Sequence, residues 1–62
     1  MLTRREEVAL KAFRGFAQEF SLERAVVLAR RSYPTVNWED PELAERMADI
    51  AVELRDAGQL KG

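Results

Sequence analysis

The sequence predicts an all-α fold in which one compact domain, residues 1–62, is built from three helices. Apolar residues recur at every third or fourth position through three separate stretches, which is the period of an amphipathic helix. Each stretch follows a residue that commonly caps a helix N-terminus, and Pro34 and Gly58 stand where the second and third stretches end. We therefore expect helices over about residues 3–20, 21–32 and 41–57.

The first helix is expected to start at a capping box, since Thr3 and Glu6 have the spacing at which each side chain bonds the other's backbone N–H. One face of this helix is apolar and consists of Ala9, Ala12, Phe13, Phe16, Ala17 and Phe20. Gly15 lies inside the helix, where glycine costs about 1 kcal/mol relative to alanine. That cost predicts the close approach of a neighbouring element at Gly15.

The second helix is expected to begin after Ser21, a common N-cap residue, and to end before Pro34, because a proline disfavours helical geometry in the preceding residue. Its apolar stripe consists of Leu22, Ala25, Val26, Ala29 and Tyr33. Val27 and Leu28 fall partly outside this stripe, so two interpretations stay open. Either the helix is central and covered on two sides, or Val27 and Leu28 form an exposed patch for a partner or a second copy.

The third helix has both of its ends marked in the sequence. Asp40 suits the N-cap, Pro41 suits the first helical position, and Gly58 suits a left-handed C-terminal stop. The expected inward residues are Leu43, Met47, Ile50, Ala51 and Leu54. Leu60 is expected to fold back onto the helix end, and Trp38, just before the cap, is expected to cover the core as a lid.

Charge is divided unevenly between the two halves of the chain. Residues 1–33 hold seven bases and four acids, which gives +3, whereas residues 34–62 hold three bases and seven acids, which gives −4. The simpler interpretation is that both halves present ordinary solvated helix faces. The alternative is a dipolar molecule whose basic end meets an anion or whose two ends meet each other.

Several classes of function are not expected. The chain has no cysteine and no histidine, and it shows no phosphate-binding glycine loop, nucleophile elbow or zinc spacing, so we expect neither an enzyme nor a metal or cofactor site. No small-molecule substrate is expected. The longest apolar run, Ala25 to Ala29, is too short to cross a bilayer, and the N-terminal residues do not resemble a signal peptide. We therefore expect a cytoplasmic protein that binds no membrane.

Several short motifs resemble a known family. They are Phe20-Ser21-Leu22 at the start of the second helix, Tyr33-Pro34, Asn37, and Leu54-Arg55-Asp56-Ala57-Gly58 at the end of the third. Over roughly residues 8–60 these motifs are similar to the C-terminal winged-helix domain of Dam-replacing-type restriction endonucleases. The resemblance implies a helix-turn-helix-like, DNA-binding core of three helices, and a β-wing is not expected within residues 1–62.

Two hypotheses of function follow. The first is a small non-enzymatic protein-binding module: a homo-oligomer, a subunit of an assembly, or an inhibitor that presents acids to a basic surface. Its expected interface residues are Val27, Leu28, Glu42, Glu45, Asp49 and Glu53. The alternative is a DNA-associated regulator, but the third helix carries five acids and only two bases, so the basic first half would have to contact the phosphates. The residues expected to do so are Arg4, Arg5, Lys11, Arg14, Arg24, Arg30 and Arg31.

Overall fold

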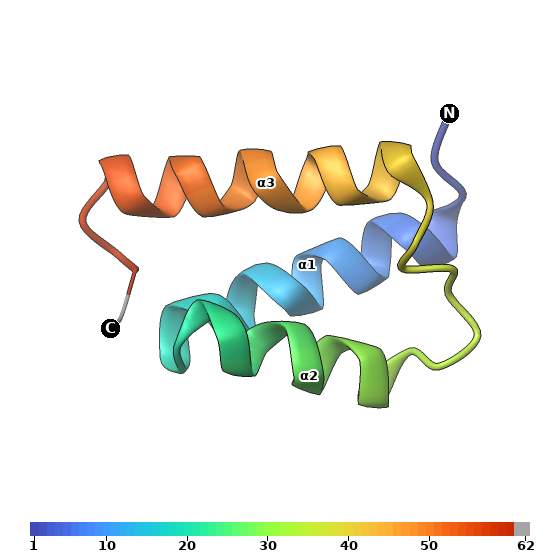
Figure 1. The fold of residues 1–62 in the computed structure, drawn as a ribbon, viewed down its shortest axis with the longest axis horizontal. Helices are drawn as coiled ribbons and strands as arrows, with labels where there is room; N and C mark the ends of the chain where they lie inside the picture. The colour runs from blue at the N-terminus through green and yellow to red at the C-terminus, as the bar shows by residue number, and fades with distance from the viewer. Residues whose placement is uncertain (61–62) are drawn as a thin grey trace.

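The computed structural model describes residues 1–60 and contains three helices, α1 (Arg4–Glu19), α2 (Leu22–Ser32) and α3 (Pro41–Asp56) (Figure 1). No strand occurs among these described residues. The expected all-α, three-helix fold is confirmed, and each helix boundary lies within one residue or two of its expected position.

The three N-terminal caps form as the sequence predicts. The Thr3 hydroxyl accepts a hydrogen bond of 3.2 Å from the Glu6 N–H, and the Glu6 carboxylate accepts one of 2.8 Å from the Thr3 N–H, which completes the capping box. Ser21 caps α2 by accepting from the Arg24 N–H, and Asp40 caps α3 by accepting from the Glu42 N–H at 2.9 Å. These bonds satisfy backbone donors that would otherwise lack a partner within the helix.

The C-terminal end of α3 is a Schellman motif. Gly58 adopts a φ of 70°, and its N–H donates to the Arg55 carbonyl at 3.0 Å. The Gln59 N–H donates to the Leu54 carbonyl at 2.8 Å, which is the second bond of the motif. Leu60 then packs against the core. The predicted glycine stop and the predicted return of Leu60 are both confirmed.

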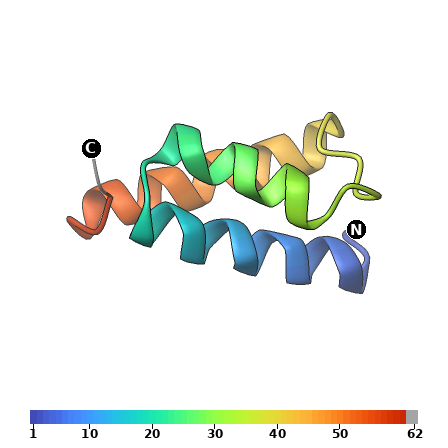
Figure 2. The same cartoon turned by 90° about the horizontal axis from the view of Figure 1, so that it is seen from below.

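Helix α1 is the central element of the fold. α2 runs antiparallel beside it and α3 packs against it in the parallel direction, whereas α2 and α3 make almost no direct contact (Figures 1 and 2). The interpretation that the second helix is central is therefore wrong. The reason is the linker of residues 33–40, which is long enough to carry the chain from α2 across to another side of α1.

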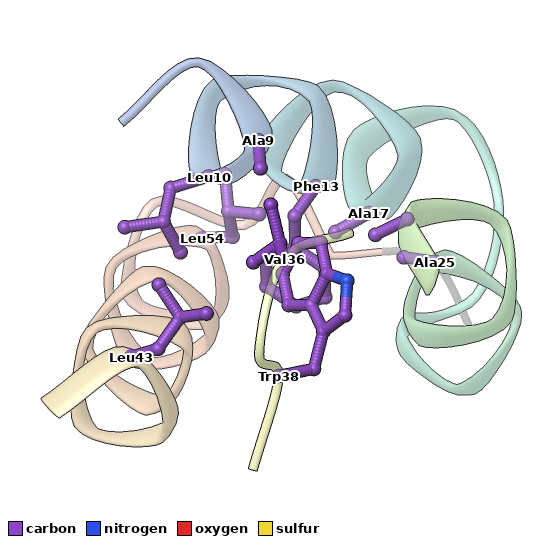
Figure 3. Close-up of a cluster of buried hydrophobic side chains, with 10 residues drawn as sticks. Ala9, Leu10, Phe13, Ala17, Ala25, Val36, Trp38, Leu43 and Leu54 are labelled. Carbon is purple, nitrogen blue, oxygen red and sulfur yellow. The ribbon is translucent and has the colours of Figure 1, made fainter. Parts of the chain in front are cut away.

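The core lies between the three helices. Its side chains are smaller on the side of α2 than on the side of α3. The buried residues are Ala9, Leu10, Phe13, Ala17, Ala25, Ala29, Val36, Trp38, Leu43 and Leu54. Between α1 and α2 the contact includes small side chains such as Ala17 and Ala25, whereas Leu10 of α1 and the larger Leu43 and Leu54 of α3 lie on the other side of the core (Figure 3). Small side chains let α2 approach α1 closely, and the larger leucines fill a wider space.

The linker closes the core with Val36 and Trp38. Both are only 7% exposed and lie close to Phe13, between α2 and α3 (Figure 3). The indole Nε1 of Trp38 donates a hydrogen bond of 3.0 Å to the Tyr33 carbonyl, so the buried ring keeps a partner for its polar atom. The predicted role of Trp38 as a lid on the core is confirmed.

Two local expectations for α1 are wrong. A Cβ at Gly15 would meet no atom within 4 Å, so no neighbouring element approaches this glycine closely. Phe20, placed by the periodicity on the inward face, is the C-cap residue and is 42% exposed. Its extended backbone conformation ends the helical periodicity, and this turns the ring away from the core.

Candidate functional site

The outward side of α2 is the first candidate interaction surface. Arg24, Val27, Leu28 and Arg31 follow the i, i+3, i+4, i+7 spacing of one helix face, on the side away from the buried Ala25 and Ala29. We call these four residues the α2 outer face. Val27 is 44% exposed and both arginines are exposed, while Leu28 is partly buried.

The α2 outer face is left uncovered because α2 packs almost entirely on α1. A helix covered on two sides would bury most of its circumference, whereas α2 buries only Ala25 and Ala29 completely. Phe20, which precedes the N-cap residue Ser21, adds a second exposed apolar side chain near the start of the helix. Of the two interpretations left open for Val27 and Leu28, the structure therefore favours an exposed patch, although Leu28 is less exposed than Val27.

The outward side of α3 is the second candidate surface. Glu45, Asp49, Val52 and Asp56 lie on one face of the helix, opposite the buried Leu43 and Leu54. We call these four residues the α3 outer face. All four are exposed, and Val52 is 44% exposed. Sequence reasoning missed Val52, although its spacing of three residues from Asp49 and four from Asp56 placed it among the acids.

Glu42 and Glu53, which were expected in the same interface, form ion pairs within the chain. The Glu42 carboxylate lies 3.3 Å from the N-terminal amine of Met1, and the Glu53 carboxylate lies 2.9 Å from Nη1 of Arg14. Glu45 and Asp49 form no ion pair within residues 1–60. The six expected interface residues thus lie on two helices, and two of the four acids form exposed ion pairs within the chain.

The seven expected nucleic-acid contacts are also spread over two helices. Arg14 pairs with Glu53, and Arg30 lies 3.6 Å from Glu39 in the linker. The remaining five form no ion pair among the described residues: Arg4, Arg5 and Lys11 on α1, and Arg24 and Arg31 on α2. On α2 the two arginines share the outer face with Val27.

The uneven charge of the two halves is partly balanced within the molecule. The Arg14–Glu53 and Arg30–Glu39 pairs each join a base of the first half to an acid of the second. The N-terminal amine and Glu42 do the same. Three exposed ion pairs thus join the two halves within one chain, and they agree with the simpler interpretation of solvated helix faces as well as with the dipolar one.

An open groove of about 550 Å³ runs between α1 and α3. Leu2, Leu10 and Ile50 contribute its apolar part. Its charged lining residues are Glu7, Lys11, Arg14, Arg46, Asp49 and Glu53. Bases and acids occur in equal number along the groove, so its lining favours neither an anion nor a cation.

Within residues 1–60 no polar or charged side chain is buried, and no group of three acids is arranged to hold a metal ion. Within the same residues no helix has the length and apolar character needed to cross a bilayer.

The connection between α2 and α3 bears on the resemblance to winged-helix domains. In a helix-turn-helix motif two helices are joined by a turn of about three or four residues and pack together. Here residues 33–40 separate α2 from α3, and the two helices hardly touch.

Comparison with family models, with curated proteins and with solved structures finds no match for the chain, so no finding links it to the winged-helix family.

Proposed function

We propose that this protein is a small non-enzymatic module that binds another protein, or a second copy of itself, through the α2 outer face. The observation that carries the proposal is the one-sided packing of α2, which leaves Val27 44% exposed between two exposed arginines. Arginine is enriched at protein interfaces, and the buried core of an interface is more apolar than the rest of the surface, so an exposed apolar residue beside two arginines supports a binding role.

The size of the module also supports a role in binding. A domain of 62 residues with a radius of gyration of 10.8 Å has a core of few residues, and its groove is open and mixed in charge. Three short helices rarely enclose the deep pocket that substrate binding requires. We therefore expect its exposed helix faces to carry the function.

Site-specific photocrosslinking in the native cell tests the proposal. A photoreactive residue at position 27 is expected to crosslink to a defined protein, or to a second copy of the chain, identified by mass spectrometry. Val8 on α1 is the matched control, because it is a valine of nearly the same exposure, 45% against 44%, on a different helix. Equal crosslinking at both positions, or none at position 27, would contradict the proposal.

A point substitution then separates binding from folding. Val27→Asp is expected to abolish the crosslinked complex and to change the free energy of unfolding by no more than about 0.5 kcal/mol, as is usual for exposed positions. Loss of binding together with loss of helical circular dichroism would instead place Val27 in the core.

DNA association through the basic half is the competing proposal, favoured by the exposed Arg24 and Arg31 on one face of α2. Binding of a labelled DNA duplex at about 50 mM salt, where electrostatic affinity is high, measures it directly. We expect that the wild type shows no DNA binding that depends on these two arginines. The Arg30→Glu/Arg31→Glu double variant should therefore give the same result as the wild type. Binding by the wild type that this variant loses would favour the DNA-associated function.

A further inference from the structure

The outer faces of α2 and α3 carry opposite charges at the same spacing. Arg24 and Arg31 lie seven residues apart on α2, and Asp49 and Asp56 lie seven residues apart on α3. At 1.5 Å per residue each pair spans about 10 Å along its helix. Two such helices laid side by side can therefore place both arginines opposite both aspartates, whichever way the helices run.

The apolar residues of the two faces occupy matching positions. Val27 is the third residue after Arg24, and Val52 is the third residue after Asp49. The two valines are equally exposed, at 44%. When the charged pairs are aligned, the valines lie between them, where apolar contact and the exclusion of water strengthen the flanking ion pairs.

These two faces cannot meet within one molecule. α2 and α3 make almost no direct contact, and each outer face lies on the side of its helix opposite the buried residues. The arginines of the α2 outer face therefore cannot reach the α3 outer face of their own molecule, where Asp49 forms no ion pair within residues 1–60 and Asp56 lies 3.5 Å from Nε of the adjacent Arg55. Arg14–Glu53 and Arg30–Glu39 show the same base-to-acid pairing between the two halves within the molecule.

We propose that the α2 outer face of one molecule binds the α3 outer face of a second copy, in a head-to-tail self-association. This inference rests on the protein-binding function proposed above and names the partner as the chain itself. Because two different faces meet, the contact is heterologous, and repeating such a contact forms a closed ring or an open chain. The net charge of −1 opposes such association only weakly.

The contact is expected to be weak. Each face contributes four residues, whereas a standard interface has about 20–30 residues on each side. Sedimentation velocity at protein concentrations up to about 1 mM measures this self-association. The measurement is made first at low ionic strength and then at about 1 M salt, where the Debye length falls to about 3 Å. The wild type is expected to associate with rising concentration and to dissociate as salt is added.

Charge-reversed variants test the two faces separately. Arg24→Glu/Arg31→Glu makes both faces acidic, and Asp49→Arg/Asp56→Arg makes both faces basic. Each variant alone is expected to lose at least about tenfold in association, since two attractive pairs become repulsive. The matched control is Arg4→Glu/Arg5→Glu, which changes the net charge by the same amount as the first variant on exposed residues of α1 and is expected to associate like the wild type.

Mixing the two reversed variants gives the decisive result. In an equimolar mixture every acidic face again has a basic partner, so association is expected to return, while circular dichroism confirms that both variants stay helical. A wild type that is monomeric at about 1 mM and low salt overturns the inference, as does a mixture that stays monomeric or a control as disruptive as the first variant. Crosslinking of position 27 to a different protein would still support the proposed function.

Discussion

The Nη1 atom of Arg14 on α1 donates a hydrogen bond of 2.9 Å to Oε1 of Glu53 on α3. The two residues are 39 positions apart, and they join the basic half of the chain to its acidic half. Their side chains are 42% and 61% exposed, so water screens the pair. Both residues line the groove between α1 and α3.

Because the pair is exposed, its contribution to stability is expected to be small. A double-mutant cycle with Arg14→Ala and Glu53→Ala should give a coupling free energy of about 0.2–1 kcal/mol that falls as salt is added. Urea denaturation of the four proteins at low and high salt measures this coupling. A value above about 2 kcal/mol, unchanged by salt, would mean that the pair is more buried than the structure shows.

Gly15→Ala is expected to stabilise the protein by about 0.5–1 kcal/mol. The glycine lies inside α1, and the added Cβ meets no atom within 4 Å, so alanine gains helix propensity without a clash. Thermal unfolding should show a rise of several degrees in Tm, as expected for a domain of this size. Gly58→Ala is the contrasting variant, and it is expected to destabilise by about 1–2 kcal/mol because Gly58 has a φ of 70°.

Trp38 is expected to contribute far more through its ring than through its hydrogen bond. Trp38→Phe keeps a buried aromatic ring, but it leaves a small cavity and loses the bond from Nε1 to the Tyr33 carbonyl, which still accepts from the Val36 N–H at 3.2 Å. A loss of about 1–2 kcal/mol is therefore expected, against about 3–5 kcal/mol for Trp38→Ala. Equilibrium urea unfolding followed by circular dichroism separates the two, and equal losses would contradict the assignment.

The close approach of α1 and α2 is expected to depend on small side chains. Ala25→Leu places a larger side chain at a site that is 0% exposed and should destabilise by about 1–3 kcal/mol through overpacking. Ala48→Leu, on an exposed position of α3, is the matched control and should change stability by less than about 0.5 kcal/mol. Tolerance of leucine at position 25 would show that the two helices are not closely packed there.

The sequence by itself determined the helix ends, because each depends on residues close together in the chain. The Thr3–Glu6 capping box joins residues three positions apart, and the Gly58 stop involves hydrogen bonds that span three to five residues. The inward face of α3 was equally predictable, because a single apolar stripe containing Leu43 and Leu54 leaves one choice of side. The apolar face expected for α1 was incomplete in its middle, where it omitted the buried Leu10, and wrong near its end, where Phe20 leaves the helix.

Only the tertiary structure decided which helix is central and which faces remain open. Apolar periodicity shows that a helix buries one side, but it does not say which other helix covers it, because that depends on the length and path of the linker. Once residues 33–40 had placed α3 against α1, Val27 and Val52 were left on outward faces, while Glu42 and Glu53 were drawn into ion pairs. Long-range contacts thus decided which side chains stay exposed and which acids and bases form ion pairs within the chain. The sequence alone did not distinguish these acids and bases from the others.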